Sequence, residues 1–239
     1  MSTVGIVCEY NPFHKGHLYQ IEQAKKLTEA DHVVCFMSGN FLQRGIPALA
    51  DKFTRAEAAI KCGVDVIFEI PFVYSTSSAR DYATAAVTMM DMSGAIDFIS
   101  FGAETDDLVL LSQIADIVEN EPPQVSDSIR RSVASGMTYG AARATAIEDY
   151  LQKKDIVRNN PSNSSSSVSK SNISSVMSSP NNILAIEYLA ALKRIKSKIK
   201  PVIIKRIISD YNTCPVSSPR RDFFTADMTS LHQYHHSAK

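Results

Sequence analysis

The sequence predicts an α/β fold built on a mostly parallel β-sheet, with helices against the sheet and a helical appendage. Short β-rich apolar runs alternate with stretches of helical length, which is the pattern of βαβ units. The runs contain few polar residues, as strands do when both faces of a parallel sheet are covered. The architecture is therefore Rossmann-like. The predicted strands are residues 4–8, 32–37, 64–70, 95–101 and 201–207.

Apolar residues recur at helical spacing between the first four predicted strands. The stripes are Leu18, Ile21, Ala24 and Leu27, then Phe53, Ala56 and Ile60, then Tyr82, Ala86 and Met89. Beyond residue 101 the pattern is helical, and we expect helices over residues 108–118, 126–134 and 139–151. A last helix is expected from Pro180, because Pro and Asn favour a helix start. Its apolar stripe is Ile183, Ile186, Leu189 and Leu192.

Five segments follow from these patterns. Residues 1–118 are expected to form the Rossmann-like core and residues 119–160 a helical segment. Residues 161–179 contain 11 serines and almost no large apolar residue. Such a composition cannot bury enough surface to offset the entropy of ordering, so we predict a disordered insertion there. Residues 180–211 are expected to form a helix and the last core strand, and residues 212–239 stay unassigned.

The composition fits one ordinary globular domain, with 44% hydrophobic and 21% charged residues. Lys plus Arg and Asp plus Glu are both 25. The net charge of zero therefore gives no overall electrostatic attraction to nucleic acid or to a membrane, and any RNA contact must come from a local basic patch. The first apolar run is too short for a signal peptide or a membrane span. The four cysteines lack a C-x-x-C pair, so we interpret them as reduced thiols of a cytoplasmic enzyme.

The segment that carries chemistry is His14-Lys15-Gly16-His17, between the first predicted strand and the first predicted helix. Open α/β sheets bind ligands at the carboxyl ends of their strands, and a helix N-terminus offers N–H groups to phosphates. Two imidazoles can stabilise charge that grows on phosphate oxygens, and Gly16 lets the backbone approach a nucleotide. Two surface histidines are the alternative interpretation, but the preceding strand and Asn-Pro-Phe favour nucleotide binding. No third ligand is near, so no metal site is predicted.

Polar residues after the later strands are expected on the same edge of the sheet. Arg44, Lys52 and Arg55 follow the second strand and are candidates to meet an anionic substrate, with solvated charges as the alternative for each. Gly102 follows the fourth strand and suits close packing on a nucleotide, with a plain turn as the alternative. Seven Lys or Arg and no acid lie within residues 193–206, either as a solvated face or as phosphate contacts.

Six segments resemble, in the same order, segments of the tRNA(Met) cytidine acetate ligase family, within the H-x-G-H nucleotidyltransferase superfamily of Rossmann-like, HUP-type folds. They are GIVCEYNPFHKGH, MSGNFLQRGIPA, GVDVIFEIPFVYS, SFGAE, PNNILAIEYLAAL and IKRIISDYN. The resemblance covers most of residues 1–211. Several separated segments in one order are far more specific than the four-residue motif alone.

The resemblance implies a two-step ligase reaction. Acetate attacks the α-phosphorus of ATP to give acetyl-adenylate, and the N4 amine of the wobble cytidine (C34) of elongator tRNA(Met) then takes the acetyl group. ATP, acetate and this tRNA are the implied substrates, and no membrane partner is implied. Mg²⁺ as a cofactor and the oligomeric state stay open. His14 and His17 are the catalytic candidates. The implied ATP site comprises Val7, Cys8, Glu9, Tyr10, Asn11, Pro12, Phe13, His14, Lys15, Gly16, His17, Leu18, Tyr19, Gln20, Gly102, Asn181, Asn182 (favoured over Asn181) and Arg206.

Two departures from the family pattern are visible. An S-A-T-x-I-R-like signature is expected after Tyr211, and residues 212–239 carry nothing convincing in its place. The serine-rich insertion before the Asn-Asn helix is the second. Together they suggest a shortened or divergent member. Three hypotheses stay open: an acetate:tRNA ligase, an adenylyltransferase that joins AMP to a small phosphorylated acceptor, and a catalytically dead nucleotide-binding or RNA-binding remnant.

Overall fold

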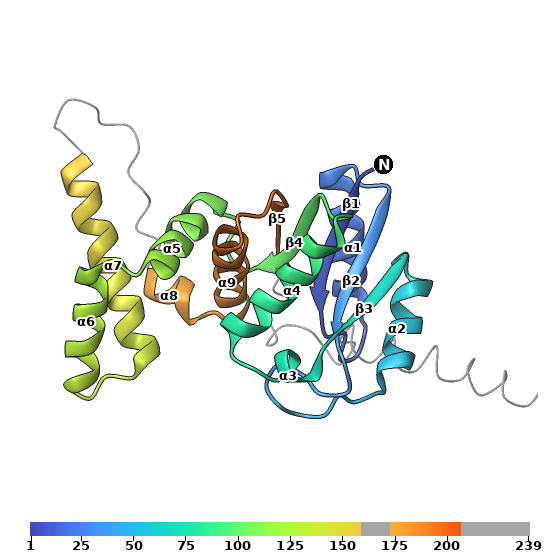
Figure 1. Ribbon diagram of the computed structural model, residues 1–239, viewed down its shortest axis with the longest axis horizontal. Coiled ribbons are helices and arrows are strands. Elements are labelled where there is room, and N and C mark those ends of the chain that lie inside the picture. Colours follow the sequence, from blue (N-terminus) through green and yellow to red (C-terminus); the bar gives the residue numbers. More distant parts are fainter. Residues whose placement is uncertain (159–172, 207–239) are drawn as a thin grey trace, which may run out of the picture.

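The computed structural model describes residues 1–158 and 173–206 of the chain. At its centre lies a five-stranded sheet in the order β3-β2-β1-β4-β5, with every neighbouring pair parallel (Figure 1). The strands are β1 Thr3–Cys8, β2 His32–Ser38, β3 Val66–Ile70, β4 Phe98–Ala103 and β5 Lys200–Lys205. The predicted Rossmann-like α/β fold is confirmed. Each predicted strand is present, and the starts of β3 and β4 move inward by two and three residues from the predictions.

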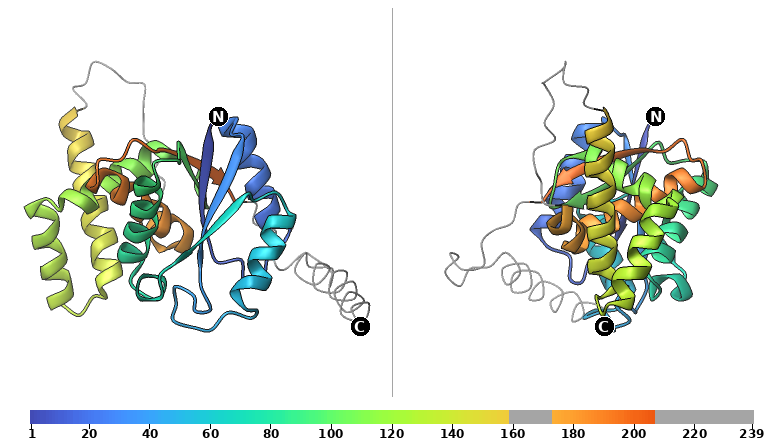
Figure 2. Two further views of the ribbon diagram at one scale, coloured as in Figure 1. Left: turned by 45° about the vertical axis from the view of Figure 1, so that its right-hand side comes forward. Right: turned by 90° about the vertical axis from the view of Figure 1, so that its left-hand side faces the viewer.

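Helices cover both faces of the sheet. One apolar cluster joins the sheet to α4 Ala79–Ser93, α5 Leu108–Asn120 and α9 Pro180–Arg194, and a second joins it to α1 Lys15–Thr28 and α2 Lys52–Lys61. The remaining helices are α3 Phe72–Ser75, α6 Pro123–Ala134, α7 Tyr139–Arg158 and α8 Ile173–Ser178. Figures 1 and 2 show α6 and α7 as a hairpin at one end of the molecule, with α9 between the hairpin and the sheet, and α8 links the hairpin to α9.

Side-chain caps fix where the helices begin. Asp51 accepts hydrogen bonds from the backbone N–H groups of Phe53 at 2.9 Å and Thr54 at 3.1 Å at the start of α2. Ser78 caps α4 and Asp107 caps α5 in the same way. Such caps satisfy N–H groups that have no partner within the helix. The polar residues between the apolar runs therefore set the helix starts.

The apolar stripe predicted on the second helix is wrong. Phe53 and Ile60 are exposed, whereas Arg55 and Ala59 face the sheet. The helix is turned because the Arg55 guanidinium donates to backbone carbonyl groups at the ends of β1 and β2. The expectation of two covered faces also fails for β3, whose Val66 and Phe68 side chains are exposed at the edge of the sheet.

Part of the serine-rich segment is helical, in contrast to the predicted disorder over residues 161–179. Residues Ile173–Ser178 form α8, and Ile173 and Val176 are buried against its neighbours. These two residues are three apart, so one face of a single helical turn is apolar although its other residues are mostly serine. Residues 161–172, the segment 207–211 and the tail 212–239 lie outside the described residues.

The strand order defines where a ligand can bind. From β1 the chain moves outward to β2 and β3, then returns to β4 on the other side of β1 and continues to β5. The order therefore reverses between β1 and β4, and open α/β sheets bind ligands at the carboxyl ends of strands beside such a reversal. In the described ranges no helix is long and apolar enough to cross a bilayer.

Candidate functional site

The first strand leads into a helix start built around His14. His14 is the N-cap of α1, and its Nδ1 accepts a hydrogen bond from the backbone N–H of Gly16 at 3.1 Å. A Cβ added at Gly16 would lie 3.0 Å from Cε1 and 3.1 Å from Nδ1 of His14, so only glycine leaves room for this cap. Because Nδ1 accepts, the hydrogen bond assigns the proton of the neutral imidazole to Nε2. Nε2–H is then the donor group of the neutral His14 ring.

The second histidine of the motif lies directly against the first. The rings of His14 and His17 stack with centroids 3.7 Å apart and planes 20° apart. Tyr10 and Phe13 place their rings 4.9 and 5.6 Å from the His17 ring. Both imidazoles are half-buried. The motif thus presents two imidazoles at the N-terminus of one helix, where the partial positive charge of the helix favours anions.

The layer beneath the histidines is uncharged. Tyr10 and Cys8 are buried, and the Tyr10 hydroxyl lies 3.2 Å from Sγ of Cys35. Burial raises the pKa of the Cys8 thiol and of the Tyr10 hydroxyl well above their ordinary values, so both stay protonated. Cys8 and Cys35 are buried, Cys62 is half-buried, and Cys214 lies outside the described residues. The side chains of Cys8 and Tyr10 therefore support the motif from the core, and only their backbone can face a ligand.

Other predicted residues of this segment hold neighbouring loops. The Glu9 carboxylate accepts from the backbone N–H of Gln43 at 2.7 Å, and Oδ1 of Asn11 accepts from that of Leu49 at 2.6 Å. Both contacts tie the loop after β2 to the histidine motif. On α1 and before it, the remaining predicted residues are half-buried or exposed: Pro12, Lys15, Leu18, Tyr19 and Gln20, with Val7 packed at the edge of the core.

The other predicted residues meet at the ends of β4 and β5. The backbone N–H of Arg206 donates to the carbonyl of Ala103 at 2.9 Å. Its Nη1 donates to Oδ1 of Asn181 at 3.3 Å. The Arg206 stem crosses Gly102, where an added Cβ would lie 3.4 Å from Cγ of the arginine. Gly102, Asn181 and Arg206, far apart in sequence, therefore form one group, called here the Asn181–Arg206 group.

Glu104 joins this group to the end of β4, although it was not among the predicted site residues. Its carboxylate accepts from Nδ2 of Asn181 at 2.6 Å and from the backbone N–H of Asn182 at 3.1 Å. The Asn182 side chain is 2% exposed, and its Oδ1 accepts from the N–H groups of Glu104 and Thr105 at 2.9 and 3.3 Å. Asn182 thus fixes the loop, and Asn181 is the residue at the rim. The acid after β4, facing two asparagines at a helix start, was the available signal.

The histidine motif and the Asn181–Arg206 group flank the same reversal of the sheet. α1 packs against β4 and β5, and Ile204 of β5 belongs to the same apolar cluster as Tyr10 and Phe13. All strands are parallel, so both groups lie at the carboxyl edge. A ligand between them would meet imidazole N–H groups on one side and a guanidinium with an amide on the other.

Two of the predicted cations do not reach this edge as free charges. Arg55 is 2% exposed and donates to the carbonyl groups of Glu9, Ser38, Gly39 and Ala50. Burial lowers the pKa of its guanidinium, and its role is structural. Lys52 pairs with Glu69 at 2.5 Å, whereas Arg44 is exposed.

The basic run over residues 193–206 is largely engaged within the fold. Lys193 pairs with Asp116 and Arg194 with Glu119, each at 2.5 Å, and Lys205 pairs with Asp106 at 3.1 Å. These pairs hold α9 against α5 and the end of β5 against the loop after β4. Three of the seven cations are therefore ion-paired within the fold, and the interpretation as phosphate contacts gains no support from them.

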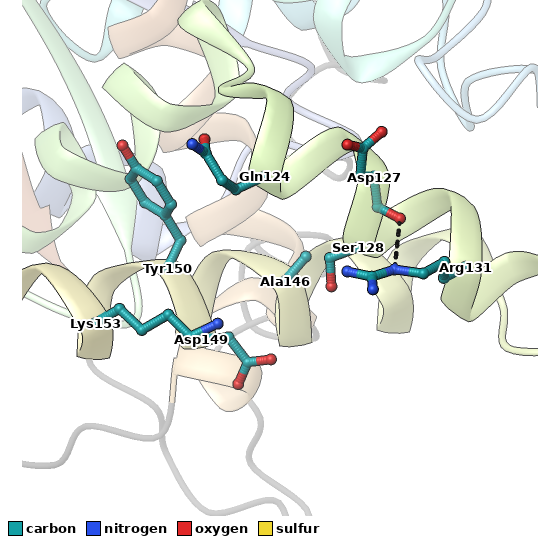
Figure 3. Close-up of a pocket in the computed structure, with 8 residues that line it drawn as sticks. All are labelled: Gln124, Asp127, Ser128, Arg131, Ala146, Asp149, Tyr150 and Lys153. Atoms are coloured by element: carbon teal, nitrogen blue, oxygen red, sulfur yellow. Dashed lines mark hydrogen bonds between the residues drawn. The ribbon is translucent and has the colours of Figure 1, made fainter.

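A hollow of about 640 Å³ lies elsewhere, between α6 and α7 (Figure 3). Acidic and basic side chains both line it, and Nε of Arg131 donates to the carbonyl of Asp127 at 3.3 Å. None of the predicted site residues lines this hollow, and its mixed charge selects no ligand. The carboxyl edge of the sheet remains the candidate site. In the described ranges no three His, Cys, Asp or Glu side chains are placed to hold a metal ion.

Comparisons with known proteins identify the family of the chain. The model of the HIGH Nucleotidyl Transferase family matches residues 1–226. The chain is 40% identical to the tRNA(Met) cytidine acetate ligase of Acetivibrio thermocellus, over 97% of this chain and 54% of that protein. It is 45% identical to the protein of that name from Caldanaerobacter subterraneus, over 86% of this chain and 47% of that protein.

Solved structures give the same result. Thermotoga maritima TmcAL bound with alpha-thio ATP superposes with a TM-score of 0.77 and 31% identity, over 98% of this chain and 52% of that chain. The apo form gives a TM-score of 0.78 and 32% identity, over 94% and 51% of the two chains. The resemblance inferred from the six segments is confirmed. The chain spans about half the length of the curated relatives it matches.

Proposed function

Because the chain belongs to the HIGH nucleotidyl transferase family, we propose that it binds ATP between the His14–His17 motif and the Asn181–Arg206 group and acts as a tRNA(Met) cytidine acetate ligase. One observation carries the proposal: two stacked imidazoles at a helix N-terminus face the reversal point of a parallel sheet. The names of the relatives support the ligase activity, and the alpha-thio ATP complex of the Thermotoga maritima protein supports ATP as substrate.

The first step is adenylation of acetate. A carboxylate oxygen of acetate attacks the α-phosphorus of ATP, the bond to the β-phosphate oxygen breaks, and pyrophosphate leaves with that electron pair. Negative charge grows on the equatorial oxygens of the α-phosphorus in the transition state. Nε2–H of His14 and the imidazole of His17 donate to these oxygens, where fixed donors have their largest effect. No nucleophilic side chain is needed, in keeping with the buried, protonated Cys8.

The second step moves the acetyl group to the RNA. The N4 amine of the wobble cytidine (C34) of elongator tRNA(Met) attacks the carbonyl carbon of acetyl-adenylate, the C–O bond to AMP breaks, and the amine loses a proton. The acceptor must then reach the carboxyl edge of the sheet from solvent. A tRNA substrate also implies that the protein acts in the cytoplasm. Mg²⁺ bound to the ATP phosphates is part of this proposal, as is the full ATP site named from the family resemblance.

The test is release of pyrophosphate from ATP, with acetate and elongator tRNA(Met) present or omitted in turn. Release is expected to require acetate and to fall by about 10²-fold or more when His14 and His17 are both replaced by alanine, since each lost donor to a developing oxyanion costs about that factor. His32→Ala is the matched control, because His32 is an exposed histidine at the opposite end of the sheet. Repeating the assay with EDTA tests the Mg²⁺ part.

Other outcomes point to the alternative hypotheses. A stable dinucleotide formed only with a phosphorylated acceptor would identify an adenylyltransferase. ATP binding by calorimetry without acetate-dependent release would identify a nucleotide-binding remnant and would contradict the ligase proposal.

A further inference from the structure

Two phenylalanines expose their rings at the carboxyl edge of the sheet, beside the histidine motif. Phe41, in the loop after β2, is 42% exposed, and Phe72, at the start of α3, is 60% exposed. Their rings meet edge to face with centroids 5.4 Å apart. Figure 1 shows the loop and α3 together at the lower edge of the sheet. Further apolar side chains are exposed on the same two segments: Ile46, Leu49, Val73 and Tyr74. Several such side chains on one edge mark an interaction surface.

The segments that carry the two rings are held in place. Oγ of Ser75 donates to the carbonyl of Phe41 at 2.9 Å, and Nε2 of Gln43 donates to the carbonyl of Ser77 at 3.0 Å. A β-bridge between Phe41 and Pro47 closes the loop on itself. The rings therefore stand on a rigid support, so a partner that stacks on them orders little that is not already ordered.

The surface adjoins the candidate ATP site without overlapping it. Glu9 and Asn11, which precede His14, accept hydrogen bonds from the loop that carries Phe41. In the strand order, β2 and β3 lie on one side of β1, whereas β4 and β5, with the Asn181–Arg206 group, lie on the other. The end of β1 thus separates a nucleotide side from an aromatic side, and a molecule on the aromatic side would approach the reacting centre from opposite the nucleotide.

The charges on this side fit a polyanion. Arg44 lies in the Phe41 loop and Arg80 near the start of α4, and both are exposed. Within residues 1–158 and 173–206 neither guanidinium forms an ion pair. Of the nearby carboxylates, Glu69 is ion-paired with Lys52, whereas Asp81 accepts from the Ser78 hydroxyl at 2.8 Å and Asp51 caps α2. Exposed rings beside free cations are the combination that binds unpaired bases and their phosphates.

We propose that Phe41 and Phe72, with Arg44, bind single-stranded RNA and place the unpaired acceptor nucleotide at the end of β1. The assignment rests on the proposed function, which requires an RNA acceptor at this edge. One ring stacks on a base of the strand, and the arginine contacts a phosphate. A second copy of the chain is the competing occupant of an apolar surface, but the free arginines favour a polyanion.

The test is fluorescence anisotropy of a labelled single-stranded RNA with the anticodon-loop sequence of elongator tRNA(Met), titrated with the full chain. The variant with both Phe41→Ala and Phe72→Ala is expected to bind at least about fivefold more weakly, because stacking of a base on an aromatic ring contributes at least about that factor. Tyr139→Ala is the matched control, since Tyr139 is also 60% exposed but lies on α7. Arg44→Gln is expected to reduce the slope of log K against log salt by about 0.7.

Three results would overturn the proposal: no RNA binding by the wild-type chain, equal binding by the double variant, or a dimer in light scattering that the double variant loses while RNA binding stays unchanged. Acetate-dependent pyrophosphate release without RNA separates this proposal from the proposed function. The double variant is expected to keep that release. If the double variant releases pyrophosphate and still binds RNA as tightly as the wild-type chain, only the RNA surface is refuted. If RNA binding depends on the two rings but the wild-type chain releases no pyrophosphate, only the ligase proposal is refuted.

Discussion

Replacing Arg55 by methionine is expected to destabilise the fold substantially, although Arg55 touches no acid. Its guanidinium donates to the carbonyl groups of Glu9, Ser38, Gly39 and Ala50, which lie at the ends of β1 and β2 and before α2. Methionine keeps the apolar stem but leaves these four carbonyl groups without their donor. A buried acceptor that loses its partner costs about 1–3 kcal/mol.

The magnitude follows from this count. Burial of the cation already costs free energy in the wild-type chain, so we take the low end, about 1 kcal/mol for each of four carbonyl groups. The sum is about 4 kcal/mol, or roughly 8–16 °C in Tm for a chain of this size. Thermal unfolding followed by circular dichroism measures it. Arg55→Lys is expected to fall in between, because an ammonium has three donors and no fork.

Arg130→Met is the matched control, because Arg130 is exposed on α6 and its one ion pair within residues 1–158 and 173–206 is with Asp127 at 3.4 Å. Its Tm is expected to stay close to that of the wild-type chain. A drop of less than about 2 °C for Arg55→Met would refute the structural role assigned to the buried guanidinium.

Three further predictions concern the site. Gly16→Ala is expected to lower acetate-dependent pyrophosphate release while Tm changes little, because the added Cβ displaces the His14 ring. Release equal to that of the wild-type chain would contradict the role given to the hydrogen bond between His14 and Gly16. Asn182→Ala is expected to lower the free energy of unfolding by about 2 kcal/mol, since two backbone N–H groups lose their acceptor. Asn181→Ala is expected to weaken ATP binding in calorimetry with little change in stability. The reverse pattern would exchange the roles of the two residues. Because the pKa of Cys8 is raised in the folded chain, its thiol contributes stability below the unfolded thiol pKa of about 8.5, and this contribution is lost as pH rises above that value. Tm is therefore expected to fall above about pH 8.5, and to fall less in Cys8→Ala. Equal declines in the two proteins would exclude this cause.

The motif and the strand segments of the first half followed from the sequence because local patterns determine them. The apolar run of β1, the turn through Pro12 and the histidine cap are contiguous, so their geometry depends on few distant contacts. α2 did not follow, because a buried cation that serves carbonyl groups from three segments overrides the apolar stripe led by Phe53.

The second half of the site depends on contacts between distant residues. Glu104 and Asn181 are separated by α5 to α8 in the chain, and only the packing of α9 beside β4 brings them together. The family resemblance named both Asn181 and Asn182 and favoured Asn182. Their burial separates them, because a buried amide that serves two backbone N–H groups is not available to a ligand.

The most direct test of the central claim follows oxygen from acetate. With acetate labelled with oxygen-18, ATP and elongator tRNA(Met), attack of acetate on the α-phosphorus leaves one labelled oxygen in the AMP product after the acetyl group moves to N4. Mass spectrometry of AMP is expected to show this label with the wild-type chain and no labelled AMP with the His14→Ala, His17→Ala variant. Labelled acetate with unlabelled AMP, despite release of pyrophosphate, would show that water and not acetate attacks, and would contradict the acetyl-adenylate mechanism.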